Sequence, residues 1–204
     1  RGLVLDNISA QPNANLGFGQ SGVSFKFWSW FAAEDREFNN VQDRLDFSLQ
    51  YDRALPAGEQ TLGLMVGFSQ YAYLNMIEGM DSSSSEVYAG LSMQNVAAPK
   101  LMAYYDFNLF DGMYIEGSVN PQFPINDEGT LKLGFNASVA GSDYGEERSF
   151  GFNDARLLAT LDIAAGPVSI IPQAGLVYSS DEIKVTEDNQ QFWGGLGIKY
   201  NAWQ

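Results

Sequence analysis

The side chains in this sequence that could do chemistry are mostly carboxylates and basic groups. They recur at alternate positions of short segments, as with Arg44, Asp46 and Asp52. Two carboxylates in different environments can act as general acid and general base. We expect them to pair with lysine and arginine instead, because acids and bases in these segments are nearly balanced. The set comprises Lys26, Arg44, Asp46, Glu86, Asp106, Glu116, Lys132, Arg156, Asp162 and Lys199.

Other catalytic groups are scarce. The chain has no histidine and no cysteine, whereas hydrolases of lipids and peptides generally use a histidine base beside Ser or Asp. The hydroxyl run Ser82–Ser85 has no such base, and its composition indicates a flexible loop. The glycines of 194–197 indicate bending of a strand rather than a phosphate-binding loop. We therefore expect no enzymatic activity, no cofactor and no dedicated metal site.

The elements that carry these charges are extended strands. In residues 44–52, Leu45, Phe47 and Leu49 alternate with charged and polar residues, and successive side chains of a strand point to opposite faces. About twelve segments show this alternation. They are 1–5, 11–19, 23–32, 43–54, 61–73, 86–95, 100–109, 113–122, 130–140, 153–164, 168–178 and 191–202.

The connections alternate between two kinds. Those after even-numbered segments are short and rich in Gly or Pro, including the LPAGEQ turn, whereas most of the others are longer and acidic. Outer-membrane barrels have this asymmetry, with short periplasmic turns, longer extracellular loops and strands of about 9–11 residues. We expect residues 1–204 to form a single domain, a closed antiparallel up-and-down transmembrane β-barrel. Pro12 and Pro172 should mark a bulge or an offset strand end.

Alternation alone also fits a soluble barrel or sandwich. Large apolar side chains on nearly every segment would fill a small barrel poorly, and aromatic residues gather near segment ends, as in membrane girdles. The charged set would then line the lumen, together with the inward aromatics Trp28, Trp30 and Trp193. A register slip by one residue would present Arg44 to lipid and would destabilise the fold by about 2–4 kcal/mol.

The net charge of −14 argues against nucleic acid as a partner, because no basic patch exists to neutralise phosphates. Most of the excess acid falls in the stretches 33–42, 75–84, 141–152 and 180–189. These loops could bind divalent cations, bridge to lipopolysaccharide or dock a basic protein partner, or they are a solvated surface. The sequence has no apolar run of the about 20 residues that a membrane helix needs, and no leader peptide is recognisable.

Four short stretches resemble a family of bacterial conserved hypothetical proteins that are outer-membrane β-barrels by prediction. They are the opening RGL with Gln11-Pro12, then 27–29 (FWS), 104–106 (YYD) and 192–196 (FWGGL). The resemblance covers most of the chain and implies the outer membrane of a Gram-negative bacterium, with no established activity. Family members have a further strand segment before RGL. The C-terminal residues resemble the signal read by barrel-assembly machinery, an expected partner besides the lipid bilayer.

Three functions are compatible with these residues. The first is a narrow passive channel for ions or small solutes. The second is a non-conducting structural barrel that anchors a surface or periplasmic partner. The third, a lipid-acting enzyme, is disfavoured by the absence of histidine. A barrel of this size lies between filled 8-stranded barrels and open 16-stranded porins.

Overall fold

The computed structural model describes residues 9–32, 43–58, 60–74, 82–108, 111–141, 150–180 and 189–200. These residues form thirteen β-strands. The strands are β1 (Ser9–Ala10), β2 (Asn13–Gly17), β3 (Val23–Ala32), β4 (Asp43–Ala57), β5 (Gln60–Leu74), β6 (Ser83–Met93), β7 (Lys100–Asp106), β8 (Gly112–Val119), β9 (Gln122–Pro124), β10 (Gly129–Gly141), β11 (Gly151–Ala165), β12 (Val168–Ser179) and β13 (Gln190–Tyr200). No helix within the described ranges is long and apolar enough to cross a membrane.

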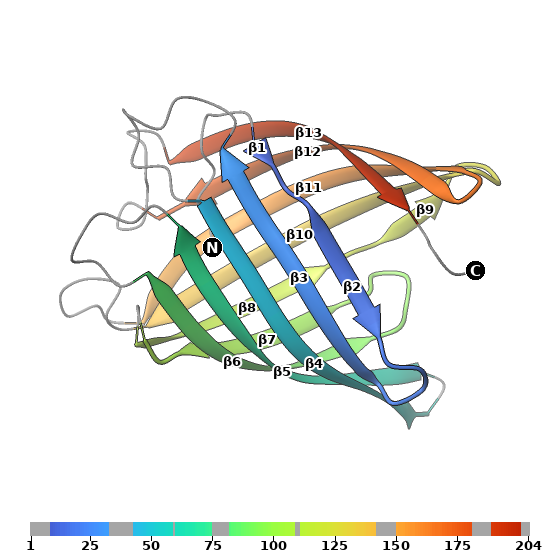
Figure 1. Cartoon of the computed structure of the whole chain (residues 1–204). Helices are drawn as coiled ribbons and strands as arrows, with labels where there is room; N and C mark the ends of the chain where they lie inside the picture. The colour runs from blue at the N-terminus through green and yellow to red at the C-terminus, as the bar shows by residue number, and fades with distance from the viewer. Residues whose placement is uncertain are drawn as a thin grey trace.

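All pairings join antiparallel neighbours in one sheet, with the order β1-β3-β4-β5-β6-β7-β8-β10-β11-β12-β13. The short strand β2 also pairs with β3, and β9 with β10, so β1 and β2 share the neighbour β3, and β8 and β9 share the neighbour β10. The prediction of an all-β, antiparallel, up-and-down sheet is confirmed. Figure 1 shows the sheet curling strongly, so that blue β3 and cyan β4 pass in front of green and yellow strands.

The strands have two kinds of end. The "turn end" is where residues 18–22, 94–99, 125–128 and 166–167 join consecutive strands, and the "loop end" is the opposite one. Gly166 forms a two-residue turn between the paired residues Ala165 and Val168. Its φ of +65° lies in the left-handed region that glycine adopts without steric cost.

Burial divides the sheet into a polar face and an apolar face. Leu49 is 53% exposed, whereas the adjacent Gln50 is 6% exposed. The polar face carries Lys26, Asp46 and Glu86, and the apolar face carries Leu49 and Phe47. Soluble proteins usually bury apolar side chains and expose charged ones, so this distribution is inverted. The buried polar residues described are Ser29, Asp43, Gln50, Ser69, Ser84, Glu86, Asp106, Ser138, Asn153, Asp154, Ser169 and Ser179.

The register keeps polar residues opposite polar residues. Lys26 pairs with Ser48 and Trp28 with Asp46 between β3 and β4, while Asn136 pairs with Arg156 between β10 and β11. Because the side-chain period is two, a slip by one residue would exchange the faces of a whole strand. Alternation in the sequence therefore favours one pairing register between neighbouring strands as well as one buried face.

The two prolines behave differently. Pro12 lies between β1 and β2, and its carbonyl accepts hydrogen bonds from Ser29 N at 3.0 Å and Ser29 Oγ at 3.1 Å. The strand end predicted at Pro12 is confirmed, but the register to β3 is the same on both sides of it, with Ala10 opposite Phe31 and Asn13 opposite Trp28. At Pro172 the ladder to β11 is interrupted, but the register is the same on both sides, with Thr160 opposite Gln173 and Ile163 opposite Ile170. The predicted bulge at Pro172 is wrong, because a proline can leave one ladder bond unmade without an inserted residue.

Several predicted boundaries are also wrong. The expected LPAGEQ turn is largely strand, because β4 continues to Ala57 and pairs there with Gln60. The expected segment 11–19 contains only the five residues of β2, and the expected segment 113–122 is interrupted after Val119, with β9 beginning at Gln122. The run Ser82–Ser85, expected to be a flexible loop, contributes Ser83–Ser85 to β6, where they pair with β5. The expected strand 1–5 lies outside the described residues.

The two outermost strand positions are β1 with β2 on one side and β13 on the other. Among the described residues, neither β1 nor β2 lies beside β13. Figure 1 shows that β2 and β13 run in the same direction. The described sheet is therefore open between these strands.

Candidate functional site on the polar face

The strongest polar cluster surrounds Arg156 of β11. Its Nη2 donates hydrogen bonds to Glu116 Oε2 at 2.9 Å and to Tyr114 Oη at 2.7 Å, both on β8. Its Nε lies 3.2 Å from Asp154 Oδ2. The guanidinium thus reaches past β10 to join two strands that are not adjacent, which fixes its position on the wall.

A β-bulge builds the site for Asp154. The register between β10 and β11 shifts between Ser138 and Val139, so that Asn153 is an extra residue opposite β10. Asp154 is fully buried, and its Oδ1 accepts a very short hydrogen bond from Ser138 Oγ. Asn153 Nδ2 donates to the same Ser138 Oγ at 3.2 Å. A buried carboxylate requires such partners because its desolvation is costly.

A second cluster surrounds Arg44 of β4. Its Nη2 lies 2.7 Å from Asp46 Oδ2, and its guanidinium carbon lies 4.9 Å from the centroid of the Trp28 ring and 5.3 Å from that of Tyr71. Tyr71 Oη donates to Glu86 Oε1 at 3.0 Å. Aromatic faces attract a cation electrostatically, so Trp28 and Tyr71 hold Arg44 against the wall.

The remaining predicted residues lie on the same face with local partners. Lys132 Nζ and Asp162 Oδ2 form an ion pair of 2.8 Å between β10 and β11. Lys26 Nζ donates to Gln50 Oε1 at 2.9 Å, and Asp106 Oδ2 accepts from Ser84 Oγ at 2.5 Å. Lys199 pairs in register with Ser169, and Trp30 with Arg44. The structure therefore places all ten predicted charges and all three predicted tryptophans on the polar face.

These contacts run along the wall. The sequence predicts pairing across an interior, but Arg44 and Asp46 are two positions apart on one strand. The ion pairs of Lys132 and Arg156 join strands that are adjacent or separated by one strand. Side chains of a curved sheet reach their strand neighbours more easily than the opposite wall, because strands lie only about 4.7–4.9 Å apart. The described ion pairs therefore leave the centre of the concave face uncrossed.

Glycines let large side chains lie flat on the wall. A Cβ at Gly67 would collide with the Tyr88 ring, and one at Gly90 would collide with Met102. A Cβ at Gly175 would come within 2.6 Å of the Trp193 indole. Tyr88 consequently extends over β5 to donate to Gln50 Oε1 at 3.1 Å. Because each of these glycines lacks a side chain, the large side chain of the adjacent strand can lie against the sheet and is not pushed towards the centre of the face.

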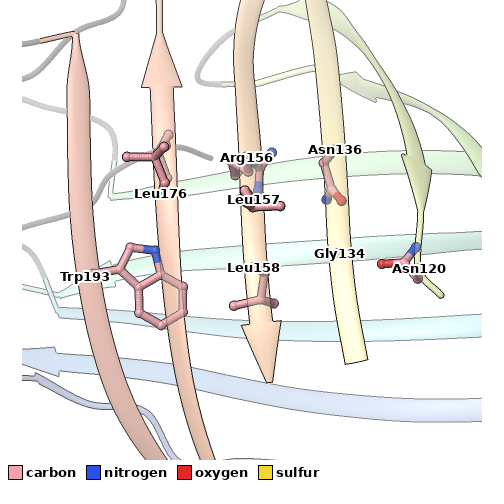
Figure 2. Close-up of a pocket in the computed structure, with 9 residues that line it drawn as sticks. Asn120, Gly134, Asn136, Arg156, Leu157, Leu158, Leu176 and Trp193 are labelled. Carbon is pink, nitrogen blue, oxygen red and sulfur yellow. The ribbon is translucent and has the colours of Figure 1, made fainter. Parts of the chain in front are cut away.

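A cavity of about 190 Å³ opens on this face between β8 and β13. Figure 2 shows Trp193 on one side, Asn120 on the other, and Gly134 and Leu158 between them. Arg156 and Asn136 add polar groups to the lining. The cavity combines an aromatic surface with hydrogen-bonding groups and is of a size for water or a small solute.

The structure supplies two residues that the sequence prediction missed. Asp154 completes the Arg156 cluster. Its spacing of two residues from Arg156 places both side chains on one face of the strand, and this was a signal that could have identified it. Gln50 accepts from both Lys26 and Tyr88, yet a neutral amide gives no charge signal in a sequence. Within the described segments, no group of three or more acidic side chains could hold a metal ion.

The hydroxyls of the serine run are used structurally. Ser84 is fully buried and donates to Asp106, while Ser85 Oγ donates to Gln70 Oε1 at 2.7 Å. A nucleophile must reach its substrate, so the buried Ser84 is poorly placed for that role. The acidic stretches proposed to bind cations or partners lie mostly outside the described residues.

Comparison with known proteins gives no match: no family model, no curated protein and no solved structure is similar to this chain. The function must therefore be argued from the geometry of the two faces.

Proposed function

We propose that this chain is an integral β-barrel of a bacterial outer membrane that acts as a narrow passive channel for ions or small solutes. The membrane assignment is supported by the inverted burial. Leu101 and Phe135 are more than half exposed, whereas Glu86 is 4% exposed. An apolar face of this extent is stabilised by acyl chains and is costly in water.

Closure of the sheet is part of the proposal. In hydrocarbon, each unpaired backbone group of an edge strand costs several kcal/mol, so sheets that span a membrane are closed. The edges to be joined are β2 and β13. In one arrangement β2 and β13 pair directly, and this pairing would be parallel because both strands run towards the turn end. In a second arrangement one further strand lies between them, and both of its pairings would be antiparallel. The second arrangement agrees with an even strand number.

The conducting function depends on one observation, the arrangement of large polar-face side chains along the wall. Tyr88, Met102 and Trp193 lie over glycines, and Arg44 and Arg156 are held by neighbours on the same wall. A closed barrel with this lining would keep a water path along its axis. Water in such a lumen would hydrate the charged side chains of the polar face, so their presence inside the barrel needs no catalytic role.

The alternative is a non-conducting barrel that anchors a surface or periplasmic partner. It is favoured by the tight pairing around Arg156 and by the row of Tyr88, Tyr104 and Tyr114, whose ring centroids are 5.7 and 5.6 Å apart in succession. Such a row narrows the lumen. A lipid-acting enzyme has less support, since the chain has no histidine and Ser84 is buried.

Location, lipid contacts and assembly follow from the same proposal. The outer membrane supplies lipopolysaccharide next to the loop end, and barrel-assembly machinery would insert the chain. Aromatic residues near strand ends, such as Tyr178 and Tyr200, suit the interfaces of that membrane.

Conductance across a planar lipid bilayer tests the channel. Purified protein should give stable single-channel steps, and replacing Arg156 by Gln should change their size and ion selectivity. Leu157→Ala on the opposite face is the matched control and should leave both unchanged. Folded, inserted protein that gives no steps would overturn the channel and leave the anchoring barrel.

A further inference from the structure

The lysines of the polar face gather at one end of the strands. Lys26 is the fourth residue of β3 from the turn end, and Lys100 is the first residue of β7. Lys132 is the fourth residue of β10, and Lys199 is the last but one of β13. Every lysine in the described part of the chain therefore belongs to this "lysine group" at the turn end.

The curvature of the sheet brings members of the group near one another. Lys26 and Lys100 lie on β3 and β7, which have three strands between them, yet Lys26 acts electrostatically on Lys100, as do Glu116 and Asp52. On the other side of the sheet, Lys132 and Lys199 both act on Asp162. The polar-face carboxylates that act on these lysines are Asp52, Glu116 and Asp162, so the four lysines outnumber them by one.

The half of the polar face nearer the loop end has the opposite composition. Its two basic residues are Arg44 and Arg156, and both are held by carboxylates of the same half. The carboxylates there are Asp46, Glu86, Asp106 and Asp154, while Glu116 lies between Arg156 and Lys100 at the border of the two halves. On the polar face, the described lysines therefore lie in the turn half and the described arginines in the loop half. The nearly balanced total charge does not reveal this separation.

We propose that the lysine group is an anion-accumulating section of the lumen and that small inorganic anions are the solutes it favours. This inference rests on the proposed channel. Rings of like charge select ions of opposite sign in pores. A unit charge about 7 Å away in water changes the local ion concentration roughly threefold, so a small excess of lysine is sufficient.

A fixed charge at only one end of a pore makes the current depend on direction. When the loop side is positive, anions move from the lysine group into the rest of the lumen and raise its ion content. When the loop side is negative, they are withdrawn and the lumen is depleted. Carboxylates of the loop half strengthen the effect, because they accumulate cations that the same voltage drives inwards.

The test is the single-channel current at both polarities in about 0.1 M KCl, where the screening length is about 10 Å. Orientation is assigned with Val96→Cys, which is unique because the chain has no cysteine. Val96 is 81% exposed at the turn end, so a bulky membrane-impermeant thiol reagent changes the current only from that side. We expect about twofold to threefold larger current with the loop side positive, and near symmetry at about 1 M KCl, where screening is complete within about 3 Å.

The variant Lys100→Gln with Lys199→Gln should reduce the current ratio to near one and shift the reversal potential in a KCl gradient towards K⁺ selectivity. Lys26 and Lys132 are retained because they hold Gln50 and Asp162. The matched control is Arg53→Gln, which removes a positive charge near the turn end of β4 but from the apolar face. It should leave the ratio and the reversal potential unchanged.

The outcomes separate the two proposals. A protein that inserts and never conducts overturns the channel, and the anion section with it. A channel with symmetric current at about 0.1 M KCl, or one whose asymmetry survives both lysine substitutions, overturns the anion section alone. The salt dependence of the unmodified protein distinguishes these outcomes even when the double variant does not fold.

Discussion

The two faces of β11 carry side chains of opposite character and opposite burial. Arg156 and Leu157 are consecutive, yet Arg156 is held by two side chains of β8 and by Asp154 of its own strand, whereas Leu157 is 51% exposed and points away from them. On the polar face, hydrogen bonds and ion pairs of defined geometry hold the side chains in fixed positions. The apolar face carries large apolar side chains without such contacts. Under the proposed membrane assignment, the apolar face contacts acyl chains and the polar face lines the lumen.

The largest expected effect comes from removing Arg156. Arg156→Met leaves Asp154 fully buried without its cation, and breaking a buried pair in this way costs about 3–5 kcal/mol. The free energy of unfolding, measured by urea titration in lipid vesicles, should fall by that amount. Adding Asp154→Asn should recover a large part of the loss. No recovery would show that the two side chains are not energetically coupled.

Arginine substitutions at adjacent positions compare the two faces directly. Leu157→Arg places a charge on the apolar face and should cost about 2–4 kcal/mol near the bilayer midplane. Leu158→Arg places the same charge on the polar face beside the cavity and should cost less. Urea titration in vesicles measures both. Equal stability of the two variants would contradict the assignment of the faces, since half-exposed Leu157 tolerates arginine when it faces water.

The glycines that receive large side chains should be sensitive for a different reason. Gly175→Val drives its side chain into Trp193, and overpacking of this kind costs about 1–3 kcal/mol. It should also push the indole towards the lumen and lower the single-channel conductance. Gly194→Val is the control, since a Cβ there has open surroundings with only Gln173 O at 3.8 Å. Unchanged conductance in Gly175→Val would exclude Trp193 as a wall element.

The smallest effect is expected for Lys132 and Asp162. Their side chains are 40% and 20% exposed, so solvent screens the pair and its coupling should be about 0.2–1 kcal/mol. A double-mutant cycle with Lys132→Gln and Asp162→Asn measures it. A coupling as large as that of Arg156 with Asp154 would mean that water is excluded from the turn end.

The faces of the strands could be predicted from the sequence because the side-chain period of a strand is fixed at two. Lys26, Arg44 and Trp193 occupy the face that alternation assigns to them. The bulge at Asn153 could not be predicted, since one extra polar residue in a polar stretch leaves no periodic signal. Pairing along the wall was also missed, because it depends on curvature and on which neighbours are glycines, such as Gly67 and Gly175.

The strand ends were predicted less well. Propensity indicates a turn at the LPAGEQ stretch, whereas pairing with β5 keeps β4 extended to Ala57, so tertiary context outweighs local preference. The serines of 83–85 are strand residues for the same reason. Hydrogen bonds to Asp106 and Gln70 compensate for their weak intrinsic preference.

A spin-label scan along β11 decides most directly whether the apolar face meets lipid. Single cysteines at 156–163, each carrying a nitroxide, report collisions with oxygen, which concentrates in lipid, and with a water-soluble nickel chelate. In vesicles we expect an alternation of period two, with oxygen favoured at Leu157, Ala159 and Leu161 and nickel at Leu158 and Thr160. Uniform nickel accessibility, or alternation in the opposite phase, would contradict the membrane assignment.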